Sequence, residues 1–384
     1  MANRFSLKKS ESGRYFDATM LLTIIFLLVF GLVALLSVSS YDGSVTYGDS
    51  AYYFKKQAIS TALGLIVMIF ISLIPYHFWE KLSALFYFGA LFLLVLIIPF
   101  GVERNGAKRW IIFFGTSIQP AEIAKLAIIV SLAHIVCKMG TSAISTWKGF
   151  CVAMAASLPM CFAIYFITRN LSSAIIVFGI AFLMCFVVSP DYRKFALIFL
   201  IFLVLIGLAV FLIVGNKDSS LGFRGERVLA WLDPNAYASG KGFQTLQALY
   251  AIGSGGFFGK GIGQSMQKLG FLPEAQNDMI FSIICEELGF FGALCVIMLF
   301  LLLIWRCMVT ANNAPDMYGA LLVVGFSGHI AIQVILNIAV VTNLIPNTGI
   351  SLPFISYGGS SVVSLLFEVG LVFGVQREII IKET

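Results

Sequence analysis

Ten long apolar stretches, separated by shorter polar ones, dominate the sequence. They cover residues 18–38, 57–75, 78–99, 120–137, 149–167, 171–189, 194–214, 278–305, 317–342 and 354–375. Each is close to the ~20 residues with which a helix crosses a hydrocarbon core. The pattern predicts an all-α polytopic membrane protein, a single domain over residues 1–384. We expect a bundle of about ten transmembrane helices with one large extracytoplasmic loop at about 216–277.

Composition supports this prediction. The chain is 59% hydrophobic and 11% charged, whereas a soluble domain carries about 25% charged residues. The first apolar run follows basic residues as a secretory signal does, but it exceeds the ~7–15 residues of a signal core, which indicates an uncleaved helix. The net charge of +6 does not indicate a nucleic-acid partner, because the basic residues form short clusters between apolar runs. No His or Cys spacing suggests a metal site.

The positive charges predict the orientation, because short cytoplasmic connections are enriched in Lys and Arg. Alternate connections carry Lys8, Lys9, Arg14, Lys81, Lys138, Lys148, Arg193, Lys194, Arg306, Arg377 and Lys382. With an even number of spans, both termini are expected to be cytoplasmic. The outer connections are then 41–56, 100–119, 168–170, 216–277 and 343–353.

The outer connections are also basic, and this weakens the simple charge rule. They include Lys55, Lys56, Lys108, Arg109, Arg224 and Arg227. An anionic ligand at the outer face would account for the excess. Within the long outer loop, residues 226–233 and 243–250 have apolar positions at helical spacing, which favours short helices at the membrane surface. The glycine-rich run 253–263 lacks the ending of a phosphate-binding loop and instead favours tight backbone packing.

Charged residues inside apolar runs are costly unless they are paired or hydrated. Glu122 and Lys125 lie three apart on one helical face and suit a mutual ion pair. A structural lock between helices and a binding role remain equally open for that pair. Glu286, Glu287 and Glu368 are expected to face the bundle interior or a polar cavity.

Asp278 lies where the long outer loop meets the next helix. There it could cap the helix, because Asp near a helix start satisfies free N–H groups. It could also reach both water and the bilayer surface. Further along, two prolines and several glycines interrupt residues 342–361. Broken backbone at membrane depth is tolerated where it is buried or lines a wet cavity, which indicates a transporter, a channel or a membrane enzyme.

Four blocks carry a family resemblance. They are Asn105–Trp110 followed by Gln119–Lys125, Arg224–Pro234 with Ala251–Gly263, Leu272–Asp278, and Pro346–Ser361. Their order and spacing resemble the SEDS family (shape, elongation, division and sporulation) over nearly the whole chain. The block ending at Asp278 resembles the one that holds the family's essential aspartate. Two sites depart from the common pattern: Gln276-Asn277 replaces His-Thr, and Asn170 replaces an aspartate. The segment around Glu368 is more similar to the division branch, FtsW, than to RodA.

The resemblance implies a peptidoglycan glycosyltransferase of the bacterial cytoplasmic membrane, active in septal or elongation wall synthesis. It implies an inverting transfer in which Asp278 is the general base and polyprenyl pyrophosphate leaves. Partners would be lipid II, the growing glycan strand, a class B penicillin-binding protein and other division or elongation proteins. A divalent cation, Mg²⁺ or Mn²⁺, is an optional cofactor. The predicted substrate-binding residues are Arg109, Glu122, Lys125, Arg224, Arg227, Lys268, Glu274 and Ser356. A lipid II flippase and a non-catalytic division scaffold remain alternatives.

Overall fold

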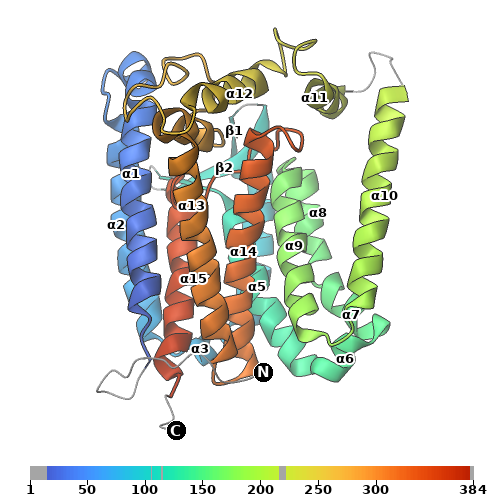
Figure 1. Cartoon of the computed structure of the whole chain (residues 1–384). Coiled ribbons are helices and arrows are strands. Elements are labelled where there is room, and N and C mark those ends of the chain that lie inside the picture. The colour runs from blue at the N-terminus through green and yellow to red at the C-terminus, as the bar shows by residue number, and fades with distance from the viewer. Residues whose placement is uncertain (1–14, 105, 114–115, 216–221, 381–384) are drawn as a thin grey trace.

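The computed structural model describes residues 15–104, 106–113, 116–215 and 222–380. Within them, ten helical segments are long and apolar enough to cross a membrane. They are α1 (Ala18–Tyr47), α2 (Tyr52–Leu73), α4 (Ser83–Phe100), α5 (Pro120–Met139), the pair α7 (Trp147–Ala155) and α8 (Leu158–Ile167), α9 (Leu171–Val188), α10 (Arg193–Gly215), α13 (Ile280–Asn312), α14 (Met317–Val341) and α15 (Gly359–Glu378). The predicted bundle of ten spans is confirmed (Figure 1).

The remaining helices are short and lie at the two ends of the bundle (Figure 1). At one end are α3 (Tyr76–Lys81) and α6 (Thr141–Ser145). At the other are α11 (Gly222–Leu232) and α12 (Phe243–Gly255), where the sequence predicts two surface helices. The two described chain ends meet, because the N–H of Tyr15 donates to the carbonyl of Ile379 at 3.4 Å. This agrees with an even number of crossings.

Three helices form the centre of the bundle. In α5, α14 and α15, 78%, 72% and 72% of the most apolar stretch is buried inside the protein. In α10 that share is 0%, and the helix stands apart from α8 and α9 (Figure 1). A helix that is apolar all round but exposed suits lipid surroundings. The buried centre of the bundle is therefore formed by α5, α14 and α15, and α10 lies outside it.

A small sheet in the connection 100–119 adds to the predicted all-helical fold. Strands β1 (Gly101–Arg104), β2 (Ala107–Phe113) and β3 (Thr116–Ile118) pair antiparallel in that order. Ala107 lies opposite Arg104, and Ile111 lies opposite Ile118. The sheet holds Arg109 on β2, directly before α5 begins at Pro120, a residue suited to the first helical turn.

Helix α13 is interrupted at Gly289, whose φ of 68° and ψ of −168° are not helical. The glycine-rich loop after α12 fills the break. The N–H of Phe290 donates to Gly256 at 2.9 Å, and the N–H of Lys260 donates to the carbonyl of Glu286 at 3.0 Å. A Cβ on Gly259 would lie 2.2 Å from a carbonyl of α13, so glycine is required for this approach. The predicted tight packing of the glycine run is confirmed.

Candidate functional site

Asp278 lies two residues before Ile280, the first residue of α13, and α13 starts at the bundle end that carries α11 and α12 (Figure 1). Met279 is the residue before the first helical residue, and its side chain makes no capping hydrogen bond. The cap position of α13 is therefore Met279 and not Asp278. The side chain of Asp278 is buried, with only 7% of the residue exposed.

Burial and a like charge act together on this carboxyl group. Removal from water, helped by the nearby carboxylate of Glu274, raises the pKa of Asp278 to about 7. The backbone N–H of Asp278 and the charge of Arg227 act in the opposite direction. A carboxylate with a pKa near neutrality can accept a proton in one step and release it in the next.

Asn337 on α14 holds the backbone that presents Asp278. Its Nδ2 donates to the carbonyl of Asp278 at 2.8 Å and to the carbonyl of Ile350 at 2.7 Å. Asn337 is fully buried, so loss of either bond would leave an unsatisfied carbonyl. Sequence reasoning missed this residue. The available signal was the four-residue spacing of His329, Gln333 and Asn337, which puts three polar side chains on one face of an apolar helix.

Arg227 lies near Asp278, and Arg109, from another element, lies near Arg227. Arg109 on β2 donates to the carbonyls of Thr168 and Arg169, both at 3.3 Å. Arg227 on α11 donates to the carbonyl of Asn347 at 3.1 Å. Burial lowers the pKa of both guanidinium groups, and their mutual repulsion lowers that of Arg109 further. The charge of Asp278 acts on Arg227 in the opposite direction, so the structure brings these predicted residues together.

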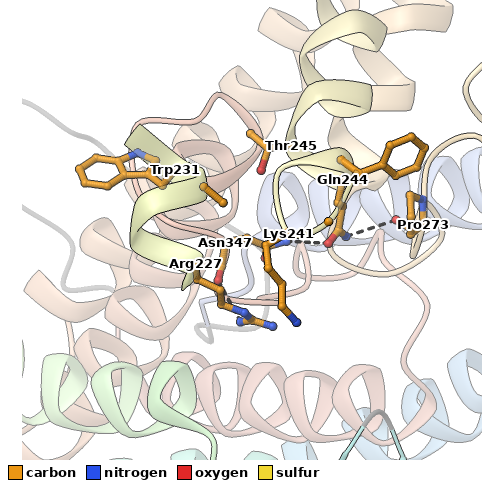
Figure 2. A pocket seen from close by; sticks show the side chains of 10 residues that line it. Arg227, Trp231, Lys241, Gln244, Thr245, Pro273 and Asn347 are labelled. Atoms are coloured by element: carbon orange, nitrogen blue, oxygen red, sulfur yellow. Dashed lines mark hydrogen bonds between the residues drawn. The ribbon is translucent and has the colours of Figure 1, made fainter. Parts of the chain in front are cut away.

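A cavity of about 230 Å³ opens beside Arg227, between α11 and α12 (Figure 2). It is lined by Arg227, Ala230, Trp231, Gly240, Lys241, Phe243, Gln244, Thr245, Pro273 and Asn347. The two charged lining residues are both cations. Figure 2 shows Arg227 and Lys241 reaching toward the same space. Sequence reasoning missed Lys241, which becomes a neighbour of Arg227 only through the fold. The cavity suits an anionic group.

Glu122 and Lys125 form the predicted ion pair, with Lys125 Nζ 2.7 Å from Glu122 Oε1. Both are buried. Ser361 on α15 donates to Glu122 at 3.1 Å, and Lys125 contacts Gln333 on α14 at 3.5 Å. The pair therefore connects the three central helices, as a structural lock would. That arrangement does not test a role in substrate binding.

A second buried pair lies deeper in the bundle. Nδ1 of His329 on α14 is 2.9 Å from a carboxylate oxygen of Glu368 on α15. Neither side chain has more than 1% of its surface exposed. The predicted inward orientation of Glu368 is confirmed.

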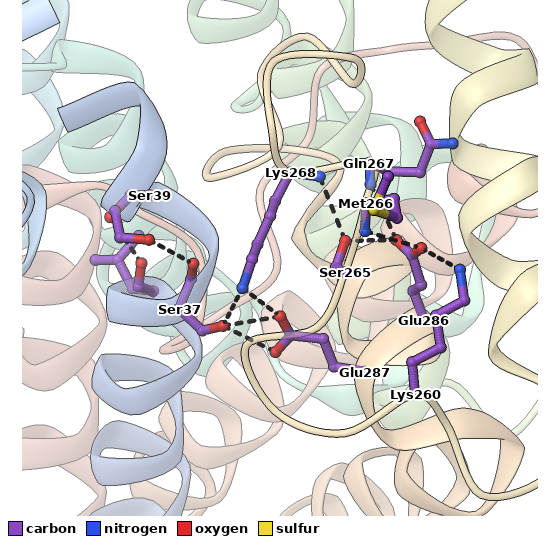
Figure 3. A network of polar contacts seen from close by, with 11 residues as sticks. Ser37, Ser39, Lys260, Ser265, Met266, Gln267, Lys268, Glu286 and Glu287 are labelled. Carbon is purple, nitrogen blue, oxygen red and sulfur yellow. Dashed lines mark hydrogen bonds and ion pairs between the residues drawn. The ribbon is translucent and has the colours of Figure 1, made fainter. Parts of the chain in front are cut away.

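Lys268 occupies a different setting from the arginines (Figure 3). Its ammonium lies 2.8 Å from Glu287 and 2.9 Å from Ser37 of α1. Beside it, Lys260 pairs with Glu286 at 2.7 Å. We name these two ion pairs the loop clamp, because they fasten the loop after α12 to α13 and α1. Lys268 is 7% exposed and its charge is already neutralised by Glu287. Its predicted role in substrate binding stays a prediction.

Three further predicted residues have different outcomes. Glu274 is exposed, has a left-handed φ of 55° and accepts a hydrogen bond from Asn277. Ser356 is buried, and its hydroxyl accepts the N–H of Leu352 at 2.7 Å, so it holds the loop's own turn. The side chain of Arg224 lies outside the described residues. Asn170, where the sequence departs from the family pattern, accepts the N–H of Ser173 and caps α9.

Among the described residues, no group of three or more His, Cys, Asp or Glu side chains could hold a metal ion. Asp278 and Glu274 are the carboxylates that influence each other at this site. A requirement for Mg²⁺ or Mn²⁺ stays a prediction.

Comparison with known proteins places the whole chain in one family. Residues 18–380 match the FtsW/RodA/SpoVE model, described as cell cycle protein. Stage V sporulation protein E of Bacillus subtilis (strain 168) is 40% identical over 363 residues, covering 94% of this chain and 97% of that protein. A probable peptidoglycan glycosyltransferase FtsW of Geobacter metallireducens is 37% identical over 374 residues, which is 97% of each chain.

Solved structures have the same fold. A chain from work described as structural coordination of polymerization and crosslinking by a peptidoglycan synthase complex superposes with a TM-score of 0.78. It is 26% identical, over 95% of this chain and 98% of that one. The rod shape determining protein RodA of Thermus thermophilus gives a TM-score of 0.66 at 25% identity, over 95% and 97%. The chain described here therefore belongs to the FtsW/RodA/SpoVE family of cell cycle proteins, as its sequence blocks predicted.

Proposed function

We propose that this protein is a peptidoglycan glycosyltransferase that polymerises lipid II at the outer face of the bacterial cytoplasmic membrane. The observation that carries the proposal is the buried carboxyl group of Asp278, with a pKa of about 7, beside Arg227. The names of the relatives, which include peptidoglycan glycosyltransferase and peptidoglycan synthase, support it. The substrate has a lipid tail and a water-soluble sugar, so the reaction requires a site at the boundary between membrane and water.

In the proposed reaction, Asp278 accepts the proton of the 4-hydroxyl of the acceptor sugar. The freed oxygen attacks the anomeric carbon of the growing strand and forms the new glycosidic bond. The bond between that carbon and the pyrophosphate oxygen breaks, and polyprenyl pyrophosphate leaves with the electron pair, with inversion at carbon. Positioned proton transfer contributes about 10²–10⁴-fold.

The leaving group needs positive charge near the breaking bond. Arg109, Arg227 and Lys241 supply it. The pyrophosphate diester of the substrate carries two negative charges, so a cluster of cations can neutralise it. Asn337 keeps Asp278 in place through the backbone. After the transfer, Asp278 releases its proton to water at the outer surface.

We also propose that both termini are cytoplasmic and that the chain works with a class B penicillin-binding protein. The name of the structural neighbour, which pairs polymerization with crosslinking, supports such a partner. A role in division in particular stays a prediction, since relatives named for sporulation and rod shape match as well. A reporter fused after Thr384 should be cytoplasmic, and one inserted at Asp233 on the α11–α12 side should be extracytoplasmic. The opposite result for either reporter would refute the topology.

The decisive experiment is polymerisation of fluorescent lipid II by the purified full-length protein with its penicillin-binding partner. Asp278→Asn keeps the size of the side chain and removes the proton acceptor. We expect a folded variant that binds lipid II but makes no glycan chains. The matched control is Asp49→Asn, because Asp49 is an exposed outer carboxylate paired with Lys55. Wild-type rates in Asp278→Asn would sink the general-base assignment.

Two other classes of function give different results in the same assay. A flippase would move lipid II across a vesicle membrane and make no chains. A scaffold would recruit the partner and do neither. Either result in the wild-type protein would replace the proposed activity.

A further inference from the structure

At the outer ends of α1 and α2, three tyrosines of these helices and one from the segment before α15 form a cluster that the proposed reaction does not use. We name it the tyrosine platform, and it consists of Tyr47, Tyr52, Tyr53 and Tyr357. The rings of Tyr47 and Tyr52 are stacked, with centroids 3.7 Å apart and planes within 11° of parallel. Tyr53 meets Tyr52 edge to face at 5.5 Å and meets Tyr357 at 5.0 Å. The rings hold one another in fixed positions.

The platform remains open to solvent on one side. Tyr47 is 50% exposed, although one face of its ring is covered by Tyr52. The other three tyrosines are half-buried. A tyrosine ring offers an apolar face at low entropic cost, because it has only two side-chain torsions. The platform therefore presents rigid aromatic surface to a ligand that arrives from the outer side.

Polar groups surround these rings. The hydroxyl of Tyr53 donates to Asp42 at 2.6 Å, and Nε2 of Gln276 donates to the same carboxylate at 3.2 Å. The ammonium of Lys56 lies 4.4 Å from the centre of the Tyr52 ring. Aromatic faces bordered by a carboxylate, an amide and an ammonium combine apolar contact with donors and acceptors. This is the chemistry that a sugar ring requires, because a pyranose has apolar C–H faces and a rim of hydroxyl groups.

The platform is joined to the turn that presents Asp278. The N–H of Tyr357 donates to the carbonyl of Gln276 at 2.9 Å, and Gln276 lies two residues before Asp278. Gln276 is also a position where this chain departs from the common family pattern. Its side chain reaches Asp42 and thereby ties that turn to α1. A ligand on the platform would therefore lie next to the proposed reaction centre.

Tyrosines also gather at membrane interfaces simply to anchor helices. Two features of the platform go beyond that role. Tyr357 comes from the non-helical segment before α15 and is hydrogen-bonded to the turn before Asp278, so it does not belong to an outer helix. Tyr53 directs its hydroxyl to a protein carboxylate. The cluster is a built surface rather than a row of separate anchors.

We propose that the tyrosine platform binds the sugar rings of the growing glycan strand and keeps that strand beside Asp278 between successive additions. This inference rests on the proposed polymerase function and deepens it by naming the site that holds the polymer. A strand retained in this way is extended many times before release. Loss of the platform should shorten the products without preventing formation of the first glycosidic bond.

The test uses the full-length protein with its partner and measures the length distribution of strands made from fluorescent lipid II. Tyr47→Ala removes the most exposed ring, and Tyr47→Ala with Tyr52→Ala removes the stack. We expect shorter strands at an unchanged rate of first-bond formation. Binding of chitohexaose, measured directly on the purified protein, should weaken on the order of tenfold in the double variant, as expected for loss of two aromatic contacts. Tyr47→Phe keeps the ring and should restore both properties.

Tyr250→Ala is the matched control, because Tyr250 on α12 is 55% exposed and lies outside the platform. Equal shortening by Tyr250→Ala would indicate general anchoring at the interface and would overturn the inference. Wild-type strand length and chitohexaose affinity in Tyr47→Ala would overturn it as well. If the wild-type protein makes no polymer but the double variant loses chitohexaose binding, the platform is supported and the polymerase proposal fails.

Discussion

The loop clamp and the site around Asp278 use positive charge in opposite ways. In the clamp, Lys260 and Lys268 each lie within 2.8 Å of a carboxylate. At the site, Arg109 is positioned by the carbonyls of Thr168 and Arg169. A carbonyl orients a guanidinium group without cancelling its charge. The partner of a cation, rather than its presence in an outer loop, therefore decides whether it can bind an anionic ligand.

The largest effect should come from removing a cation at the site. Arg227→Gln takes away one charge that would stabilise the leaving pyrophosphate, and we expect polymerisation to fall on the order of 10²-fold. Thermal stability should change little. Arg377→Gln is the control, because Arg377 also donates to a carbonyl, that of Leu73, but at the other end of the bundle. Equal losses of activity in both variants would contradict the assignment of Arg227.

The same kind of change in the clamp should affect stability instead. Lys268→Met leaves the buried carboxylate of Glu287 without its cation, which typically costs about 3–5 kcal/mol. The midpoint of thermal unfolding in detergent should fall, while the activity of each folded molecule should remain close to that of the wild type. Lys268→Met combined with Glu287→Met should recover most of the loss. A stable but inactive Lys268→Met protein would indicate that Lys268 takes part in substrate binding.

The central pair of Glu122 and Lys125 allows a direct test of whether two buried charges neutralise each other. If each charge neutralises the other, either single Ala substitution should cost more than half of the double substitution's effect on the unfolding midpoint. The reason is that each single variant leaves one buried charge uncompensated. Strictly additive losses would indicate separate roles. Activity measured on the same three variants would then decide between a lock and a binding role.

The smallest effect concerns the pH dependence of the reaction. In the proposed mechanism Asp278 must be ionised to act as a base, so activity should rise with pH through its pKa of about 7. Glu274→Gln removes a like charge and should lower that pKa, so the acid limb should move to lower pH. Arg227→Gln should move it the other way. Since Glu274 is exposed, the shift should shrink at high salt. Glu226→Gln, another exposed outer carboxylate, should leave the profile unchanged.

Ionisation of Asp278 also links pH to stability. The pKa in the folded state, about 7, lies above the ordinary value of 3.8. The folded protein therefore binds the proton more tightly than the unfolded chain does. It follows that this contribution to stability is greatest at low pH and is lost as the pH rises through the folded pKa.

The membrane spans, the family and the position of Asp278 could all be predicted from the sequence. Spans are a local property, because ~20 apolar residues in a row suffice to cross a bilayer whatever the rest of the chain does. The pairing of Glu122 with Lys125 was also local, since residues three apart share a helical face. The glycine run predicted close backbone packing, because only glycine permits it.

Which charges are neutralised, and which residues hold the backbone of Asp278 in place, depend on the tertiary structure. Lys268 contacts Ser37, which is 231 positions away, and Asn337 holds the carbonyl of a residue 59 positions away. No local pattern encodes such contacts, because hydrogen bonds and ion pairs depend on distances in space. The tyrosine platform likewise forms only where the segment before α15 meets the outer ends of α1 and α2. The folded bundle thus determines which polar side chains face a ligand, because a buried charge is costly unless it finds a partner within the protein.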